Sequence, residues 1–262
     1  MIESLHSPHV ARVKALIGSR GVKERKESGL FIAEGMQAAR EALASKSEPK
    51  VKSLYVTSGG LLKLVDHDLS SIDVVEVSDA VMQEMTSTVS PQGVLALCHI
   101  PQRNIENYQN LFTRPSSRIV YLHEIQDPGN AGTILRSADA MGVTAVITSP
   151  GSVDFYSPKV VRSTAGSLWN IPIFEGVSFP DLEKIAVGYT SLLLSSHAQK
   201  SILDLDKSNS YIAIFGNEAR GVSAESLGST QVLPVTIPMA GRAESLNLSA
   251  AASIVMFTLS RA

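Results

Sequence analysis

Three stretches of this 262-residue chain combine glycine with side chains that donate and accept hydrogen bonds, and each follows an apolar run. They span residues 124–136, 214–221 and 237–249. Glycine turns and free backbone amides at the carboxyl edge of a sheet are a common way for α/β proteins to hold a small ligand. The chain contains neither G-x-G-x-x-G nor G-x-x-x-x-G-K-[ST], so an ordinary dinucleotide or P-loop site is not supported.

The third stretch predicts a strand, a loop and a helix in that order. An apolar strand over residues 232–237 ends at Pro238, because proline lacks the backbone donor that a strand ladder needs. We expect Gly241 to be the pivot of the loop that follows. A helix is predicted from Leu246 onward, since apolar residues recur with helical spacing as far as Phe257.

The first stretch predicts a strand followed by a helix with a charged outer side. Ile119–Leu122 is the expected strand, and Asn130 is placed to cap a helix that Gly142 closes. Arg136 lies about 200° around this helix from the apolar Ile134, at ~100° per residue. The arginine is therefore expected to point away from the core.

In this order, the three stretches resemble motifs 1, 2 and 3 of the SpoU (TrmH-like) branch of the SPOUT RNA methyltransferases. The resemblance implies methyl transfer from S-adenosylmethionine to a ribose 2′-OH of RNA. It implies a catalytic set that consists of Asn130, Arg136, Glu218, Ser245 and Asn247. It implies a cofactor-binding set that consists of Gly216, Asn217, Ile237, Met239 and Leu246, with Ser195 and Ser196 as weaker candidates. It also implies an α/β SPOUT domain with a C-terminal trefoil knot, paired as a homodimer.

Elementary chemistry narrows some of these roles. A guanidinium with a pKa above ~12 is a poor general base, so Arg136 is better suited to binding a phosphate through its planar fork. Glu218 is expected to orient Arg136 through a charge-assisted bond. Ser245 and Asn247 order the loop of the third stretch and contact Arg136 or the ribose, or they cap the last helix, and both roles can coexist. Arg242 either touches phosphate or pairs with Glu244 across the dimer.

The first 28 residues carry more basic than acidic side chains. The basic ones are Arg12, Lys14, Arg20, Lys23, Arg25 and Lys26, and the acidic ones are Glu3, Glu24 and Glu27. A short amphipathic helix is predicted from Pro8, followed by a charged loop. Two interpretations stay open: a solvated face, which is the commoner case, or an arm that contacts RNA phosphates without reading sequence.

Residues 29–100 alternate predicted strands and helices, which indicates a small α/β sandwich with a short, mostly parallel sheet. The runs 30–35 and 90–96 resemble the substrate-binding domain of many SpoU enzymes, which is similar to a ribosomal protein of the kink-turn-binding type. The polar segment 86–92 then faces RNA, or it is only a capped loop. These patterns predict an RNA-binding domain over 1–104, a linker over 105–117 and a methyltransferase domain over 118–262.

Composition is that of an ordinary globular α/β protein, with 44% hydrophobic residues and a net charge of −2. RNA must therefore bind at local basic patches rather than in a protein-wide positive field. The single Cys98 lies in an apolar run, so we expect a small buried side chain, no disulfide and no metal site. No apolar run reaches the ~18 residues of a spanning helix. The expectation is a cytoplasmic protein that binds neither membrane nor DNA.

Large-subunit rRNA is the expected substrate, because chains with this N-terminal domain resemble rRNA 2′-O-methyltransferases of the thiostrepton-resistance type. A tRNA ribose is the alternative within the same chemistry. A non-catalytic RNA-binding or ribosome-assembly protein is the alternative from a different class. S-adenosylmethionine would not raise the thermal stability of such a binding protein, because only a ligand of the native state does so.

Overall fold

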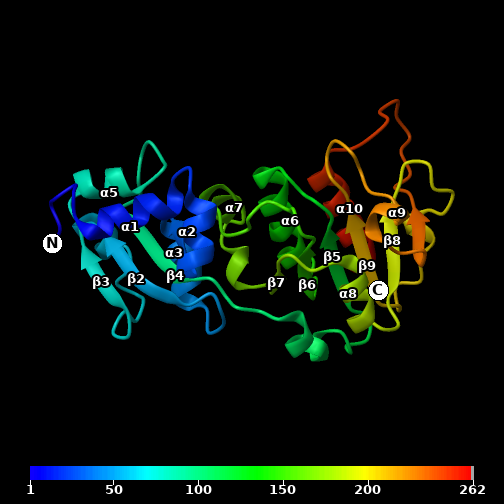
Figure 1. Cartoon of the computed structure of the whole chain (residues 1–262), viewed down its shortest axis with the longest axis horizontal. Helices are drawn as coiled ribbons and strands as arrows, with labels where there is room; N and C mark the ends of the chain where they lie inside the picture. Colours follow the sequence, from blue (N-terminus) through cyan, green and yellow to red (C-terminus); the bar gives the residue numbers. More distant parts are fainter. Residues whose placement is uncertain (261–262) are drawn as a thin grey trace. The chain divides into compact units, whose positions relative to one another are not determined.

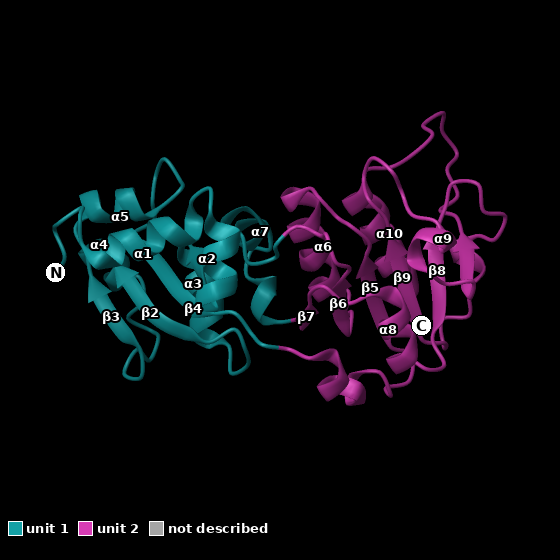
Figure 2. Cartoon of the chain, viewed as in Figure 1, with its two compact units in different colours: residues 1–102, 154–170 teal, residues 103–153, 171–262 magenta. Residues whose placement is uncertain are grey.

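The computed structural model describes residues 1–260, and the chain forms two compact units (Figures 1 and 2). Unit 1 consists of Met1–Gln102 and Asp154–Asn170, and unit 2 consists of Arg103–Val153 and the chain from Ile171 onward. The predicted second domain, 118–262, thus contains a segment that packs in unit 1. Its last two residues, 261–262, lie outside the described part of the chain.

Unit 1 is built on a four-stranded sheet in the order β1-β4-β2-β3. The strands are β1 Leu30–Glu34, β2 Val51–Val56, β3 Asp73–Glu76 and β4 Val94–His99. Strand β4 runs antiparallel to both β1 and β2, and only β2 and β3 are parallel, so the predicted mostly parallel sheet is wrong. Local periodicity identifies strands, but their direction depends on pairing between distant segments, such as Leu30 opposite His99.

The helices of unit 1 are α1 Pro8–Ile17, α2 Gly21–Ser28, α3 Met36–Ala44, α4 Ser58–Leu62, α5 Asp79–Met85, α7 Pro158–Ser163 and the 3₁₀ helix η2 Ser167–Trp169. Helix α1 begins as predicted, with the Ser7 hydroxyl accepting from the Val10 N–H. The predicted charged loop after α1 is instead the helix α2. This helix buries only Gly21 and Arg25, so its sequence has no apolar stripe from which a helix could be predicted.

Both faces of the edge strand β1 are covered within unit 1. Leu30 and Ile32 belong to a core cluster that includes residues of α1 and α5. Phe31 lies against the rings of Tyr156 and Trp169, at centroid distances of 5.0 and 6.3 Å. The segment 154–170 therefore completes the second apolar layer of unit 1.

Unit 2 is a six-stranded sheet in the order β10-β8-β9-β5-β6-β7, and every pairing in it is parallel. The strands are β5 Arg118–Leu122, β6 Ala145–Thr148, β7 Ile173–Phe174, β8 Thr190–Leu194, β9 Tyr211–Phe215 and β10 Val232–Val235. This parallel sheet agrees with the α/β domain that the resemblance implies for this part of the chain.

Helices cover both faces of the sheet in unit 2 (Figure 1). They are η1 Ile105–Leu111, α6 Pro128–Ala140, α8 Phe179–Ile185, η3 Ile202–Asp204, α9 Ala224–Leu227 and α10 Leu248–Ser260. Helices α6 and α10 pack together, and the Ser137 and Ser253 hydroxyls are 2.8 Å apart. On the other face, Ile105 and Phe112 join the core cluster with Phe179. The predicted linker 105–117 is thus partly packed in unit 2.

Cys98 is fully buried on β4, as predicted, and burial raises the pKa of its thiol because the thiolate is poorly solvated there. The thiol therefore acts as a small core side chain. Within residues 1–260, no helix has both the length and the apolar character needed to cross a membrane.

Candidate active site

A cavity of about 460 Å³ opens in unit 2 where the chain leaves β8, β9 and β10, three neighbouring strands of the parallel sheet. Its lining consists of Asn130, residues 194–196, 215–218, 221–222, 236–237 and 239, residues 244–248, and Ala251. All five predicted cofactor residues line it, as do four of the five predicted catalytic residues. Arg136 is the exception. The cavity therefore brings parts of all three polar stretches together at the carboxyl edge of the sheet.

The turn after β9 is closed by two backbone hydrogen bonds between Asn217 and Gly221, of 3.1 and 2.8 Å. A Cβ at Gly216 would lie 2.4 Å from the carbonyl carbon of Gly221, and Gly221 has a φ of +65°. Both positions thus require glycine for the turn itself. The backbone at Gly216 thus lies close to the far side of this turn.

Asn217 is buried and orders the same turn. Its Oδ1 accepts from the Ala219 and Arg220 N–H groups at 3.0 and 3.1 Å, and its Nδ2 donates to the Glu124 carbonyl at 2.9 Å. The side chain therefore joins the first stretch to the second, and it also lines the cavity.

Glu218 lies at the N-terminus of α6 rather than beside Arg136. Its carboxylate accepts from the Gln126 and Asp127 N–H groups, each at 3.2 Å, and from Asn130 Nδ2 at 3.3 Å. The expected bond from Arg136 to Glu218 is absent among the described residues. This position stabilises the negative charge of the Glu218 carboxylate, because helix N-termini carry free N–H donors and a partial positive charge.

Asn130 is the third residue of α6 and not its cap. Asp127 takes the cap position, and its Oδ1 accepts from the Asn130 N–H at 2.7 Å. The Asn130 side chain is free to bridge, and its Oδ1 accepts from Asn247 Nδ2 at 3.2 Å. Asn247 Oδ1 in turn accepts from the Ser249 and Ala250 N–H groups and so caps α10.

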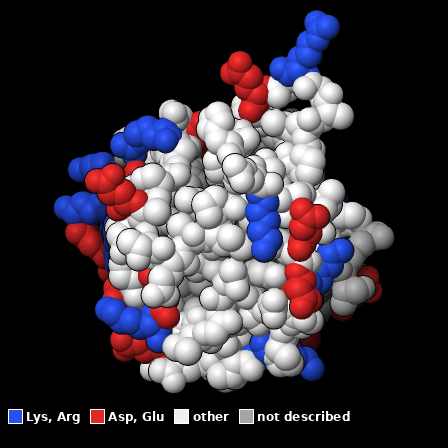
Figure 3. All heavy atoms as spheres, turned by 90° about the vertical axis from the view of Figure 1, so that its right-hand side faces the viewer, with Lys and Arg blue, Asp and Glu red and all other residues white. Residues whose placement is uncertain are grey.

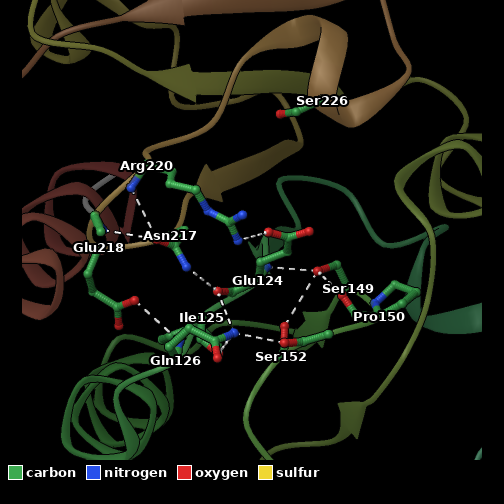
Figure 4. A network of polar contacts seen from close by, with 12 residues as sticks. Glu124, Ile125, Gln126, Ser149, Pro150, Ser152, Asn217, Glu218, Arg220 and Ser226 are labelled. Carbon is green, nitrogen blue, oxygen red and sulfur yellow. Dashed lines mark hydrogen bonds and ion pairs between the residues drawn. The ribbon is translucent and has the colours of Figure 1, made fainter.

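A second network surrounds Glu124, which has a left-handed φ of +52° (Figure 4). Its N–H donates to Ser149 Oγ at 2.8 Å, and its carboxylate pairs with Arg220 at 2.5 Å. Gln126 Nε2 donates to the Gly151 carbonyl at 2.8 Å. The loop between β5 and α6 is thus held by the loop after β6 and by the turn after β9. No local sequence pattern predicts these partners, because they lie far apart along the chain.

Arg136 is exposed on α6 and forms no hydrogen bond or ion pair with another of residues 1–260. It lies about 9 Å along the helix axis from Asn130, at ~1.5 Å per residue. Its guanidinium is therefore available to an anion from outside the chain. Ser245 lines the cavity and is exposed.

The loop 238–247 differs from expectation at Gly241. A Cβ there would meet no atom within 4 Å, and Gly241 is not among the glycines with positive φ, so the predicted pivot is wrong. The loop carries one arginine and one glutamate, and charged side chains project from it at the top of Figure 3. Glu244 lines the cavity, while Arg242 does not. The two charged residues of the cavity wall, Glu218 and Glu244, are both acidic.

His123 follows β5 directly, and its Nδ1 is buried without a hydrogen-bond partner among the described residues. Burial lowers the pKa of this imidazole, and the positive charge of Arg220 lowers it as well. The negative charge of Glu124 acts in the opposite direction. The ring is therefore neutral at neutral pH. Within residues 1–260, no cluster of three His, Cys, Asp or Glu side chains is placed to hold a metal ion.

Two families match this chain. The SpoU rRNA methylase family matches residues 117–257, and the MRM3-like substrate-binding domain matches residues 8–96. A 23S rRNA (guanosine(2553)-2′-O)-methyltransferase, RlmP of Bacillus subtilis, is 32% identical over 90% of this chain and 91% of its own length.

Solved structures agree with these matches. An S-adenosylmethionine-bound rRNA methyltransferase from Sinorhizobium meliloti is 28% identical and superposes with a TM-score of 0.84, covering 99% of this chain and 97% of that one. The SpoU methyltransferase AviRb of Streptomyces viridochromogenes, solved with the same cofactor, is 25% identical with a TM-score of 0.81, covering 97% and 98%. The family match spans more than half of the sequence, so the chain belongs to the SpoU rRNA methylase family.

Proposed function

We propose that this protein transfers a methyl group from S-adenosylmethionine to a ribose 2′-OH of large-subunit rRNA. One observation carries the proposal: the hydrogen-bonded series Glu218–Asn130–Asn247 joins all three polar stretches at the wall of the cavity. Two relatives, one from Bacillus subtilis and one from Streptomyces viridochromogenes, are named as 23S rRNA 2′-O-methyltransferases and support the substrate.

The lining of the cavity suits the proposed cofactor in both polarity and charge. Apolar side chains such as Val222, Ile237 and Leu246 offer a surface for adenine, while the turn 216–221 offers backbone groups. Its two charged lining residues are acidic, which suits a sulfonium cation. When bound, S-adenosylmethionine would supply an electrophilic methyl group.

The residues of this chain then position the nucleophile. Arg136 binds a phosphate next to the target ribose, because its planar fork suits phosphate and a protonated guanidinium has no site that could take the proton. Ser245, on the cavity wall, is placed to contact the ribose. Asn130 and Asn247 hold the two helix N-termini at fixed positions beside it. These contacts act by orientation, which is a major source of rate enhancement.

Unit 1 is proposed to bind the RNA. The buried Glu34 carboxylate accepts from the N–H and hydroxyl groups of Ser87 and Thr88 and from Arg162, and so orders the polar loop 86–92. A cavity of about 250 Å³ next to it is lined by donors and acceptors that include Gln37, Thr86, Ser90 and Gln92. RNA loops are commonly recognised by such groups.

Some basic side chains among the first 28 residues are held by acidic partners within the protein, and others are exposed to solvent. Lys14 pairs with Glu84, and Arg25 is buried against Asp154. Lys23 is exposed and lies 3.6 Å from Glu27. A shallow groove at α2 is lined by Lys23 together with Arg20 and Lys26. The exposed ones are the proposed phosphate contacts.

We also infer a homodimer and a knotted C-terminus. Ile254 and Phe257 on α10 are 39% and 42% exposed, and Met239 and Leu246 at the cavity are each 38% exposed. A second copy of the chain is the proposed cover for this apolar face, which adjoins the cavity. Helix α10 returns from the edge strand β10 to pack on β5, β9 and α6, which is the placement a trefoil knot requires. A cytoplasmic location belongs to the same proposal.

Competition between RNAs tests the substrate. The chain is incubated with labelled S-adenosylmethionine and equal masses of unmodified large-subunit rRNA and bulk tRNA. Label at one alkali-resistant position of rRNA is expected, and label confined to tRNA would move the chemistry to the alternative substrate. Absence of label together with no S-adenosylmethionine-dependent thermal shift would favour a non-catalytic RNA-binding protein.

A further inference from the structure

Two anchors lie on either side of the peptide bond between Val153 and Asp154. In unit 2, the Val153 N–H donates to the Ile125 carbonyl at 2.8 Å, so Val153 holds the loop between β5 and α6 directly. In unit 1, Oδ2 of the Asp154 carboxylate lies 2.8 Å from both Nε and Nη2 of Arg25. Val153, which is bonded to the loop between β5 and α6, is thus followed directly by a residue of a buried ion pair.

The arginine side of this pair is built for burial. The Arg25 side chain is 4% exposed, and its Nη1 donates to the Leu16 carbonyl. A Cβ at Gly21 would lie 2.6 Å from that Nη1 and 2.4 Å from the Leu16 oxygen, so glycine leaves room for the guanidinium. An unpaired buried charge is strongly destabilising, so Arg25 holds Asp154 firmly.

Asp154 also sets the course of the chain after it. Its Oδ1 accepts from the Tyr156 N–H at 2.8 Å, and its carbonyl accepts from the Ser157 N–H at 3.1 Å. Phe155 and Tyr156 are buried next to it. The ion pair therefore sits at a point where both the backbone and the side chains of the segment 154–170 are fixed.

The residues just before Asp154 hold a strained part of the candidate active site. Ser149 Oγ accepts from the Glu124 N–H, and the Gly151 carbonyl accepts from Gln126 Nε2, each at 2.8 Å. Glu124 has a φ of +52°, which a residue with a side chain keeps only when its surroundings hold it. The loop continues into Asp127, the cap of the helix that carries Asn130 and Arg136.

We propose that Arg25 and Asp154 are positioning residues for methyl transfer. The ion pair fixes residues 149–154, and these fix the loop 124–127 and with it the start of α6. Neither residue lines the cofactor cavity, so the pair acts on the turnover rate and not on cofactor affinity. This inference rests on the proposed function.

The test compares the full-length variants Arg25→Met, Asp154→Asn and Arg25→Lys with the wild type. Val13→Ala, a truncation in the core of unit 1 at a residue outside the ion pair, is the control for general destabilisation. Three quantities are measured: amide hydrogen exchange at Glu124 and Val153, kcat and KM for rRNA, and the Kd of S-adenosylmethionine. Arg25→Met and Asp154→Asn are expected to speed exchange at both amides about tenfold and to lower kcat about tenfold, because small misplacements remote from the chemistry are costly.

Cofactor Kd should stay within about twofold in every variant, and Arg25→Lys should recover part of both effects because it restores the charge. Val13→Ala should lower the melting temperature and leave exchange at the two amides and kcat unchanged. Unaltered exchange in Arg25→Met, or faster exchange with wild-type kcat, would overturn the proposal, as would equal effects in Val13→Ala. Absence of methyl transfer by the wild type would instead overturn the proposed function, while the exchange data still decide whether Arg25 holds the loop.

Discussion

The Asn247 side-chain amide donates to Asn130 Oδ1 across 3.2 Å, joining two residues 117 positions apart in the sequence. Asn130 Nδ2 donates to Glu218, a carboxylate that only accepts. Asn130 must therefore turn its nitrogen to Glu218 and its oxygen to Asn247. Asn247 keeps its own oxygen for the amides at the start of α10. Chemistry alone fixes the orientation of both amides.

Substitutions of Asn247 separate its two roles. Asn247→Ala should lower the free energy of unfolding by about 1 kcal/mol, since it removes a helix cap, and should also lower kcat. Asn247→Ser keeps a capping oxygen but loses the bond to Asn130, so its stability should stay near that of the wild type while kcat still falls. Urea unfolding and methyl-transfer rates measure the two effects. Wild-type kcat in Asn247→Ser would show that the bond between the two asparagines is dispensable.

Gly216→Ala should abolish tight cofactor binding. The added Cβ would lie 2.4 Å from a backbone carbon of Gly221 and 2.6 Å from Val222 Cβ, so the turn that lines the cavity must open. Gly241→Ala, in the loop 238–247, is the matched control, because its Cβ would meet open space. Calorimetry with S-adenosylmethionine should show a loss of at least about tenfold in the first variant, the scale of 1.4 kcal/mol, and little change in the second. Equal affinities would contradict the proposed cavity wall.

His123 should make unfolding depend on pH. Its folded-state pKa is lowered, so above the unfolded value of about 6.5 the ring is neutral in both states and contributes nothing. As the pH falls below that value, the unfolded chain binds the proton first, and stability declines until the folded-state pKa is passed. His123→Gln should therefore gain stability relative to the wild type between pH 7.5 and pH 5.5 in urea titrations. A constant difference between the two proteins would count against a lowered pKa.

The apolar face of α10 should control the oligomeric state. A charge at Phe257 or Ile254 would have to be buried against a second copy, which is unfavourable without a partner. Phe257→Glu should therefore shift the protein from dimer to monomer in sedimentation. Val187→Glu, at a more exposed apolar side chain outside this face, is the control and should leave the dimer intact. A wild-type monomer at micromolar concentration would refute the proposed interface.

Local signals predicted the elements better than they predicted their partners. Ser157-Pro158 stands at the start of α7, and Asp127-Pro128 carries the same cap-then-proline pattern for α6. The expected cap at Asn130 is wrong, because Asp127-Pro128 starts the helix before that residue. Its bridging role was beyond the sequence, because it depends on a side chain far along the chain.

Long-range pairing accounts for the other differences. The direction of β4, the burial of Arg25 against Asp154 and the membership of residues 154–170 in unit 1 all arise from segments far apart in the sequence. Hydrophobic periodicity is a property of one short segment and does not predict contacts between distant segments. The three polar stretches could be found because each follows its own strand, and parallel strands end at one edge of the sheet.

The most direct test is the transfer of tritiated methyl from S-adenosylmethionine to unmodified large-subunit rRNA by the wild type and by Arg136→Ala, with Arg136→Lys as the conservative control. The wild type should label one ribose, and Arg136→Ala should lose about 100-fold or more in kcat, the scale of a lost charged contact in a transition state. Its cofactor Kd should be unchanged, because Arg136 does not line the cavity. Full activity in Arg136→Ala, or no label from the wild type with normal cofactor binding, would contradict the account.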